Sequence, residues 1–272
     1  MNGQEFRAAL HSGRRVYGTA VTSASLPYLE VMKQVGIDWV FIDNEHAPIG
    51  RESTAWLCRS YAAAGIVPVV RIPHAEPWLA TMALDAGARA IIVPYMESPE
   101  KVREMVGAVK LRPLKGGKLT ELLEGGPGLD ERTPEYLRDR NKHSSLIINV
   151  ESVPALERLD ELYSVEGLDA AIIGPHDLSV SLGIPEQYDH PLFEEAALKI
   201  IRTARAHGLG AGAHIWYGIE QQLQFVREAG ANLIADSADF IFARDTLQRD
   251  LQAMRETLGD LPAARGDDDE VI

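Results

Sequence analysis

Residues 26–46 read LPYLEVMKQVGIDWVFIDNEH, and this stretch contains one complete unit of the pattern that decides the fold. Its first ten residues carry apolar side chains at helical spacing, and Gly36 is a typical helix stop. Asp38–Asp43 then forms a short apolar run, which predicts a buried strand. The strand ends in an acidic residue and His46 follows soon after, so ionisable side chains lie at the end of a buried strand.

The same unit recurs along the chain, and five predicted helices close on a glycine shortly before a buried strand. Eight predicted strands favour a closed parallel (β/α)8 TIM barrel of the α/β class. An open doubly wound sheet is the second choice, because that fold usually needs fewer strands. The strands are expected at Tyr17–Val21, Asp38–Asp43, Val67–Ile72, Ala90–Tyr95, Ser145–Glu151, Ala170–Pro175, Gly210–Ile215 and Asn232–Ser237. Helices are expected at Leu26–Val35, Ser53–Ala64, Pro77–Ala86 and Pro191–Ala206.

No linker or change of composition divides the 272 residues, so residues 1–262 are predicted to form a single barrel domain. The segment 112–141 is rich in glycine, proline and charge. We expect it to be irregular and to cover the active site or contact a neighbouring subunit. Residues 263–272 include four consecutive acidic residues and are predicted to be a disordered tail.

The formal net charge of −13 argues against nucleic acids and acidic membranes as partners, since both need a positive surface. No apolar stretch reaches transmembrane length, and the N-terminal residues lack a signal-peptide pattern. Cys58 is the single cysteine, which we expect to be a buried small hydrophobe. The expected setting is therefore cytoplasmic.

Residues at the C-terminal ends of the strands are the candidates for chemistry, because parallel barrels carry their active sites there. Glu151 ends the fifth predicted strand and Asp177 follows the sixth. Two carboxylates in one barrel mouth repel each other unless a cation lies between them. With waters and a chelating substrate, they would suit Mg²⁺ or Mn²⁺. The spacing is equally compatible with two carboxylates that cap the following helices.

His46 and Arg71 are the second group of candidates. His46 comes three residues after Asp43, a spacing at which a carboxylate can orient an imidazole as a general base. A structural loop histidine beside a solvated acid is the alternative. Arg71 ends an otherwise apolar strand, where it would hold a carboxylate or stabilise an enolate oxygen. A salt bridge to Glu45 or another acid at the mouth explains Arg71 equally well.

Lysines are absent from the predicted strands and from their C-terminal ends. A Schiff-base mechanism needs a desolvated lysine inside the barrel mouth. An aldolase with this sequence is therefore predicted to use a metal ion.

Five motifs occur in the order of one known family, and the resemblance covers about residues 5 to 255. They are IDNEHAP at 42–48, PVVR at 68–71, IVP at 92–94, INVE at 148–151 and IGPHDLS at 173–179. On these motifs the chain resembles the HpcH/HpaI family of class II pyruvate aldolases, which is related to the citrate lyase β-subunit. The likeness extends to 4-hydroxy-2-oxoheptanedioate aldolases.

This resemblance implies a role for each strand-end residue. Glu151 and Asp177 would bind a divalent ion that chelates pyruvate; the ion would be Mg²⁺ or Mn²⁺, with Co²⁺ as a third candidate. His46, oriented by Asp43, would act with a metal-bound water as base on the 4-hydroxyl group. Arg71 would stabilise the enolate.

The resemblance also implies how the substrate and the subunits are held. The backbone of Gly174, Pro175, His176 and Asp177 would hold the substrate carboxylate, and His214 is a further substrate-binding candidate. Asp85 would reach the pocket of an adjacent subunit. The family forms homohexamers built from trimers, in which the last helix, here about Phe240–Leu258, is exchanged between subunits.

The predicted function is a metal-dependent lyase that cleaves a 4-hydroxy-2-oxo acid into pyruvate, or a close 2-oxo acid, and an aldehyde. The alternative is a synthase or acyl-CoA lyase of the citrate type. That alternative needs a basic patch for CoA phosphates, for which Arg112, Lys115 and Lys118 are candidates. The aldehyde is not assigned, because residues 111–119 depart from the family loop and the bulky Trp216 and Tyr217 follow the seventh strand.

Overall fold

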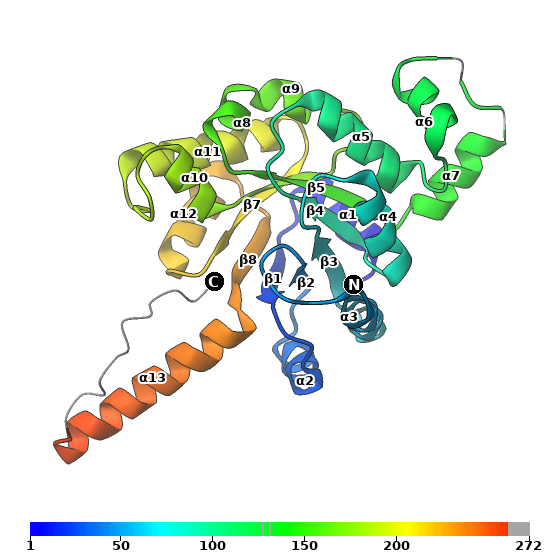
Figure 1. Cartoon of the computed structure of the whole chain (residues 1–272). Coiled ribbons are helices and arrows are strands. Elements are labelled where there is room, and N and C mark those ends of the chain that lie inside the picture. The colour runs from blue at the N-terminus through cyan, green and yellow to red at the C-terminus, as the bar shows by residue number, and fades with distance from the viewer. Residues whose placement is uncertain (127, 131, 261–272) are drawn as a thin grey trace.

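The computed structural model describes residues 1–126, 128–130 and 132–260. Eight parallel strands pair in chain order, and the last strand pairs with the first, so the sheet closes into a barrel surrounded by helices (Figure 1). The (β/α)8 prediction is confirmed. The strands are β1 (Val16–Val21), β2 (Trp39–Asp43), β3 (Val67–Arg71), β4 (Ala90–Val93), β5 (Ser145–Val150), β6 (Ala170–Ile173), β7 (Gly210–Ile215) and β8 (Leu233–Ala238).

Helices follow most of the strands, and α1 precedes the first one. Within the described residues, no helix is long and apolar enough to cross a membrane. The helices are α1 (Gly3–Ser12), α2 (Leu26–Val35), α3 (Arg51–Ala63), α4 (Pro77–Ala86), α5 (Pro99–Lys110), α6 (Gly116–Leu123), α7 (Thr133–Asn141), α8 (Val153–Glu157), α9 (Leu159–Tyr163), α10 (Pro175–Ser181), α11 (Pro191–Ala206), α12 (Ile219–Ala229) and α13 (Asp239–Leu258).

Each predicted strand is present, and α2, α4 and α11 begin and end where they were predicted. Among the strands, the largest differences are at β4 and β6, which each end two residues earlier than expected. Pro94 follows β4, and it has no N–H with which to continue the strand pairing. Beyond β6, the chain turns at Gly174 into α10.

The segment 112–141 differs from its prediction, because it contains α6 and α7 instead of an irregular loop. Figure 1 shows both helices at one side of the molecule, away from the barrel strands. A proline in the first turn of α7 is a helix-start signal that the glycine-rich composition obscured. The predicted tail at 263–272 lies outside the described residues.

Alternate residues of the strands fill the barrel interior, and this places a polar layer above the apolar one. Phe41 and Val69 belong to the buried interior cluster. Side chains in a strand point to one face at every second position. Asp43 and Arg71, two positions further on, therefore lie on the same inner face, and they are opposite each other in the pairing of β2 with β3.

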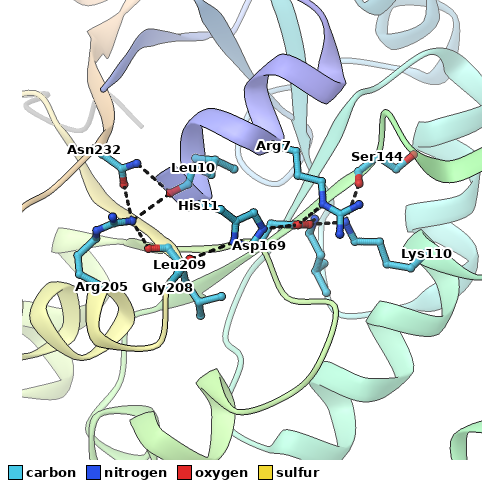
Figure 2. Close-up of polar contacts among 11 residues, drawn as sticks. Arg7, Leu10, His11, Lys110, Ser144, Asp169, Arg205, Gly208, Leu209 and Asn232 are labelled. Carbon is cyan, nitrogen blue, oxygen red and sulfur yellow. Dashed lines mark hydrogen bonds and ion pairs between the residues drawn. The ribbon is translucent and has the colours of Figure 1, made fainter. Parts of the chain in front are cut away.

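The N-terminal end of the barrel is closed by α1, which is anchored to the buried carboxylate of Asp169 (Figure 2). Asp169 is 0% exposed and immediately precedes β6. Its oxygens accept hydrogen bonds from Arg7 Nε at 2.7 Å, from His11 Nε2 at 3.0 Å and from Lys110 Nζ on α5. Burial opposes ionisation, but these three partners outweigh it and lower the pKa of Asp169.

The last helix, α13, extends away from the barrel (Figure 1). Its first residue, Asp239, is held by the backbone N–H and hydroxyl groups of Thr22 and Ser23 beyond β1. Beyond its first turn, α13 has no buried residue. An apolar stripe at helical spacing runs along it, formed by Leu247, Leu251, Met254 and Leu258.

Candidate active site

Glu151 lies at the bottom of the barrel mouth, directly after β5, and is only 2% exposed. Its Oε1 accepts a hydrogen bond from the backbone N–H of Tyr95 at 2.7 Å, and its Oε2 accepts one from Asn149 Nδ2 at 2.8 Å. A Cβ on Gly174 would come within 2.2 Å of Oε2, so only glycine leaves room for this carboxylate. Burial raises the pKa of Glu151 despite these hydrogen bonds, and the charge of Asp177 adds to the effect.

Asp177 lies in the first turn of α10 and approaches the same site from the next strand–helix connection. Its Oδ1 accepts a hydrogen bond from the Tyr95 hydroxyl at 3.0 Å. Burial and the charge of Asp177 raise the pKa of Tyr95 to about 12, so the phenol stays protonated as a donor. Tyr95 therefore joins Glu151 and Asp177 through its two ends.

Neither carboxylate caps a helix, which removes the alternative that the spacing left open. Ser152 is the N-cap residue of α8, and its side chain accepts the hydrogen bond from Ala155 N. Gly174 is the N-cap residue of α10, where no side-chain cap is formed. Glu151 and Asp177 are therefore available for other ligands.

The donor set around Glu151 and Asp177 fits a hard divalent ion. Carboxylate and amide oxygens are the ligands that Mg²⁺ and Mn²⁺ prefer. Within the described residues, the buried Oδ1 of Asn149 has no hydrogen-bond partner, and no third His, Cys, Asp or Glu completes a metal-binding group. An ion held by these two carboxylates would need water or substrate oxygens to complete its coordination.

Asp43 and Arg71 form a bidentate ion pair beside these carboxylates. Arg71 Nε donates to Asp43 Oδ1 at 3.0 Å, and Nη2 donates to Oδ2 at 2.6 Å. Arg71 Nε also lies 3.1 Å from Glu45 Oε2, so the ion pair that the sequence offered as an alternative is present. Burial opposes ionisation of Asp43, but Arg71 outweighs it and lowers the pKa of Asp43.

Glu45 is a functional candidate that the sequence reasoning treated only as an ion-pair partner. Burial raises its pKa to about 7. Arg71 acts against this increase, whereas the charges of Glu151, Asp43 and Asp177 add to it. The barrel mouth thus gathers four carboxylates around one guanidinium, which is a field that attracts cations.

His46 lies in the loop after β2 with 52% of its side chain exposed. The predicted contact from Asp43 to its imidazole is replaced by a different arrangement. Asp43 Oδ1 accepts a hydrogen bond from the backbone N–H of His46 at 3.4 Å, while the carboxylate itself is paired with Arg71. The carboxylate nearest to the ring is that of Glu45, whose Oε2 is 3.8 Å from His46 Nε2.

His214 lies inside the barrel near the end of β7, and burial lowers its pKa to about 4. Its Nε2 lies 2.9 Å from the backbone oxygen of Ser237, so the neutral ring donates a hydrogen bond there. The ring packs edge-on against Phe41 and tilted against Trp216, at centroid distances of 5.3 and 5.5 Å. His214 is therefore a neutral part of the barrel lining.

An aromatic cluster continues from Trp216 over the end of β7. Tyr188 and Tyr217 are stacked, with centroids 3.9 Å apart, and Trp216 packs edge-on against Tyr188. The Tyr217 hydroxyl donates to Gln221 Oε1 at 2.6 Å, which fixes the stack to α12. These rings form an aromatic wall at the C-terminal end of β7.

The remaining candidates fall into two positions. Gly174, Pro175 and His176 begin α10 beside Glu151, and the exposed His176 ring lies 3.6 Å from Glu186. Asp85 lies near the C-terminal end of α4, where Arg112 Nη1 donates to it at 3.1 Å. Within a single chain Asp85 is therefore on the outer surface, away from the barrel mouth.

Tyr95 and Asn149 are the residues that sequence reasoning missed. Tyr95 lies two positions beyond β4, and Asn149 lies two positions before Glu151 on the same inner face. Their positions at strand ends were a usable signal. The candidates were selected by charge and by histidine enrichment, and Tyr95 and Asn149 are neutral.

Comparisons with known proteins show the family of the chain. The profile of the HpcH/HpaI aldolase/citrate lyase family matches residues 18–241. A hydroxypyruvate/pyruvate aldolase from Roseovarius nubinhibens is 32% identical over 255 residues, which cover 92% of this chain and 96% of that protein. A 2-keto-3-deoxy-L-rhamnonate aldolase from Klebsiella pneumoniae is 32% identical over 90% of this chain and 91% of that protein.

Solved structures of similar proteins share the fold of this chain. A family protein from Burkholderia cenocepacia has a TM-score of 0.78 at 29% identity, covering 93% of this chain and 99% of that one. The citrate synthase SbnG has a TM-score of 0.77 at 28% identity, covering 93% and 98%. The chain therefore belongs to the HpcH/HpaI aldolase/citrate lyase family and is an enzyme of the aldolase type.

Proposed function

We propose that the protein is a divalent-metal-dependent aldolase that cleaves a 4-hydroxy-2-oxo acid into pyruvate, or a close 2-oxo acid, and an aldehyde. The observation that carries this proposal is the pair of carboxylates, Glu151 and Asp177, joined through Tyr95. The guanidinium of Arg71, which Asp43 orients beside them, supplies the fixed positive group that the reaction needs.

The chain's own residues divide the chemistry. Removal of the 4-hydroxyl proton lets the bond between C3 and C4 break, which leaves an aldehyde and a negative charge on the 2-oxo oxygen. His46 is the base, because its half-exposed ring lies in the loop after β2, beside Glu45. Arg71 stabilises the developing charge, since within the described residues its Nη1 has no hydrogen-bond partner. A divalent ion held by Glu151 and Asp177 would supply Lewis-acid stabilisation of that charge.

The aldehyde end of the substrate is bordered by the aromatic wall of Tyr188, Trp216 and Tyr217. The relatives named above differ in substrate: one is named for hydroxypyruvate and pyruvate, another for 2-keto-3-deoxy-L-rhamnonate. A substrate panel should therefore contain the 4-hydroxy-2-oxo acids that pyruvate and hydroxypyruvate form with small, hydroxylated and aromatic aldehydes.

Pyruvate release from this panel, followed with lactate dehydrogenase, tests the proposal. We expect activity with added Mn²⁺ or Mg²⁺ and a loss of at least about 100-fold after treatment with EDTA, because a divalent ion supplies several kcal/mol of charge stabilisation. Restoring the ion should restore the rate. Full activity in EDTA-treated, metal-free protein would contradict the metal-dependent mechanism.

A citrate-type synthase is the second candidate, which the similarity to SbnG supports. The basic residues proposed for CoA phosphates support it less. Arg112 is paired with Asp85, and it follows the end of α5 that lies away from the barrel mouth. If no compound of the panel releases pyruvate, while pyruvate or oxaloacetate is consumed with an acceptor acid, the synthase is the better assignment.

We also propose that the protein is a homo-oligomer, a trimer or hexamer, in which a second copy covers α13. The apolar stripe supports this, since Leu247, Met254 and Leu258 are each more than half exposed in the single chain. Replacing Leu247 and Met254 together by aspartate should lower the mass measured by light scattering to that of a smaller species. Leu192→Asp changes an equally exposed leucine on α11 and should leave the mass unchanged. A monomeric wild-type protein would contradict this assembly.

A further inference from the structure

Tyr95 has an unusual position between the two proposed metal ligands. It lies two residues beyond β4, and its backbone φ is 49°, in the left-handed region. That conformation is unfavourable for a tyrosine and persists where the surroundings hold it. The surrounding contacts here are the two carboxylates, Glu151 at the backbone N–H and Asp177 at the hydroxyl.

The two carboxylates depend on Tyr95 to different degrees. Glu151 is held on both oxygens, by the backbone of Tyr95 and by Asn149, so it does not need the phenol. Asp177 is held on one oxygen, and among the described residues the Tyr95 hydroxyl is its one hydrogen-bond donor. Loss of that hydroxyl would therefore release Asp177 and leave Glu151 in place.

Asp177 needs such a restraint because its charge is next to that of Glu151. Each charge raises the energy of the other, and a mobile Asp177 side chain would turn away from Glu151. A phenol restrains the carboxylate and leaves its negative charge in place. A lysine or an arginine would neutralise that charge. Residues that orient metal ligands in this way commonly change metal affinity by 10- to 100-fold.

We propose that Tyr95 is a positioning residue that holds Asp177 in place for the divalent ion before the ion binds. This inference rests on the proposed function, in which Glu151 and Asp177 share the ion. Tyr95 acts through Asp177 and is not assigned a contact with the substrate. Its role is therefore expected in the affinity for the ion and not in the rate of the loaded enzyme.

Tyr95→Phe tests this inference, because it removes the hydroxyl and keeps the ring and the backbone N–H. We expect the Kd for Mn²⁺, measured by calorimetry or electron paramagnetic resonance without substrate, to rise about 10-fold. The kcat at saturating Mn²⁺ should stay within about threefold of wild type, while the Mn²⁺ concentration for half-maximal rate rises with the Kd. A merely structural role would not separate these two quantities.

Two further variants complete the experiment. Tyr136→Phe changes a similarly exposed tyrosine on α7 and should leave the Kd unchanged. Glu151→Gln should abolish measurable Mn²⁺ binding. If wild type binds Mn²⁺ and Tyr95→Phe binds it equally or more tightly, the inference about Tyr95 is wrong and the proposed function stands. If wild type does not bind Mn²⁺, the proposed metal site itself is wrong.

Discussion

Replacing Arg71 by alanine is expected to lower kcat for pyruvate release by about two to three orders of magnitude. The guanidinium is held by Asp43 and Glu45 at 2.6–3.1 Å, so it is already oriented before the substrate arrives. Fixed charges of this kind stabilise a transition state without the cost of reorganising at the moment of reaction. Steady-state kinetics with saturating Mn²⁺ and substrate measure the decrease in kcat.

The variant must be separated from a folding defect, because Arg71→Ala leaves two partly buried carboxylates without their counter-ion. Arg71→Lys keeps the positive charge but cannot form the bidentate pair, so we expect it to recover only part of the rate. Arg103→Ala removes an exposed arginine on α5 and should match wild type. A near-normal kcat for a folded Arg71→Ala protein would remove Arg71 from the mechanism.

The largest effect on stability is expected from Asp169→Ala, which should lower the free energy of unfolding by about 3–5 kcal/mol. The substitution leaves Lys110, whose side chain is 11% exposed, buried without a counter-ion. It also removes the anchor that α1 gains through Arg7 and His11. Urea unfolding at fixed protein concentration measures the change. Asp139→Ala, which breaks an exposed pair with Lys142, should leave the free energy of unfolding close to that of wild type.

The difference between wild type and Asp169→Ala should also depend on pH. The folded protein lowers the pKa of Asp169, so its contribution is fully present above the ordinary carboxylate pKa of about 4. It is lost as the pH falls through the still lower pKa of the folded state. A gap that widened on acidification, or that was absent at neutral pH, would contradict this account of the cluster in Figure 2.

Much of the candidate site could be predicted because strand ends can be located from local patterns. The run from Ser145 to Val150 is apolar and is followed at once by Glu151. A parallel barrel brings all such positions to one mouth, so Glu151, Asp177, Arg71 and Asp43 were expected together. Helix capping competed with metal binding only until the caps were known to be Ser152 and Gly174.

The choice of partners among those residues could not be predicted. Asp43 is three residues from His46 and 28 residues from Arg71, yet its carboxylate pairs with Arg71. The arginine lies opposite Asp43 in the neighbouring strand, and it offers two donors where the imidazole would offer one. The short sequence distance favoured His46 as the partner of Asp43. The strand register instead places Arg71 beside the carboxylate.

The sequence alone determined the barrel and the positions that carry its chemistry, because hydrophobic periodicity, helix-stop glycines and strand ends are local properties of the chain. The tertiary structure decided which charges meet. Tyr95 reaches Asp177 across 82 residues, and Arg7 reaches Asp169 across 162. Contacts of that separation depend on barrel closure and on distances of a few ångströms between strands and helices, for which a linear pattern has no signal.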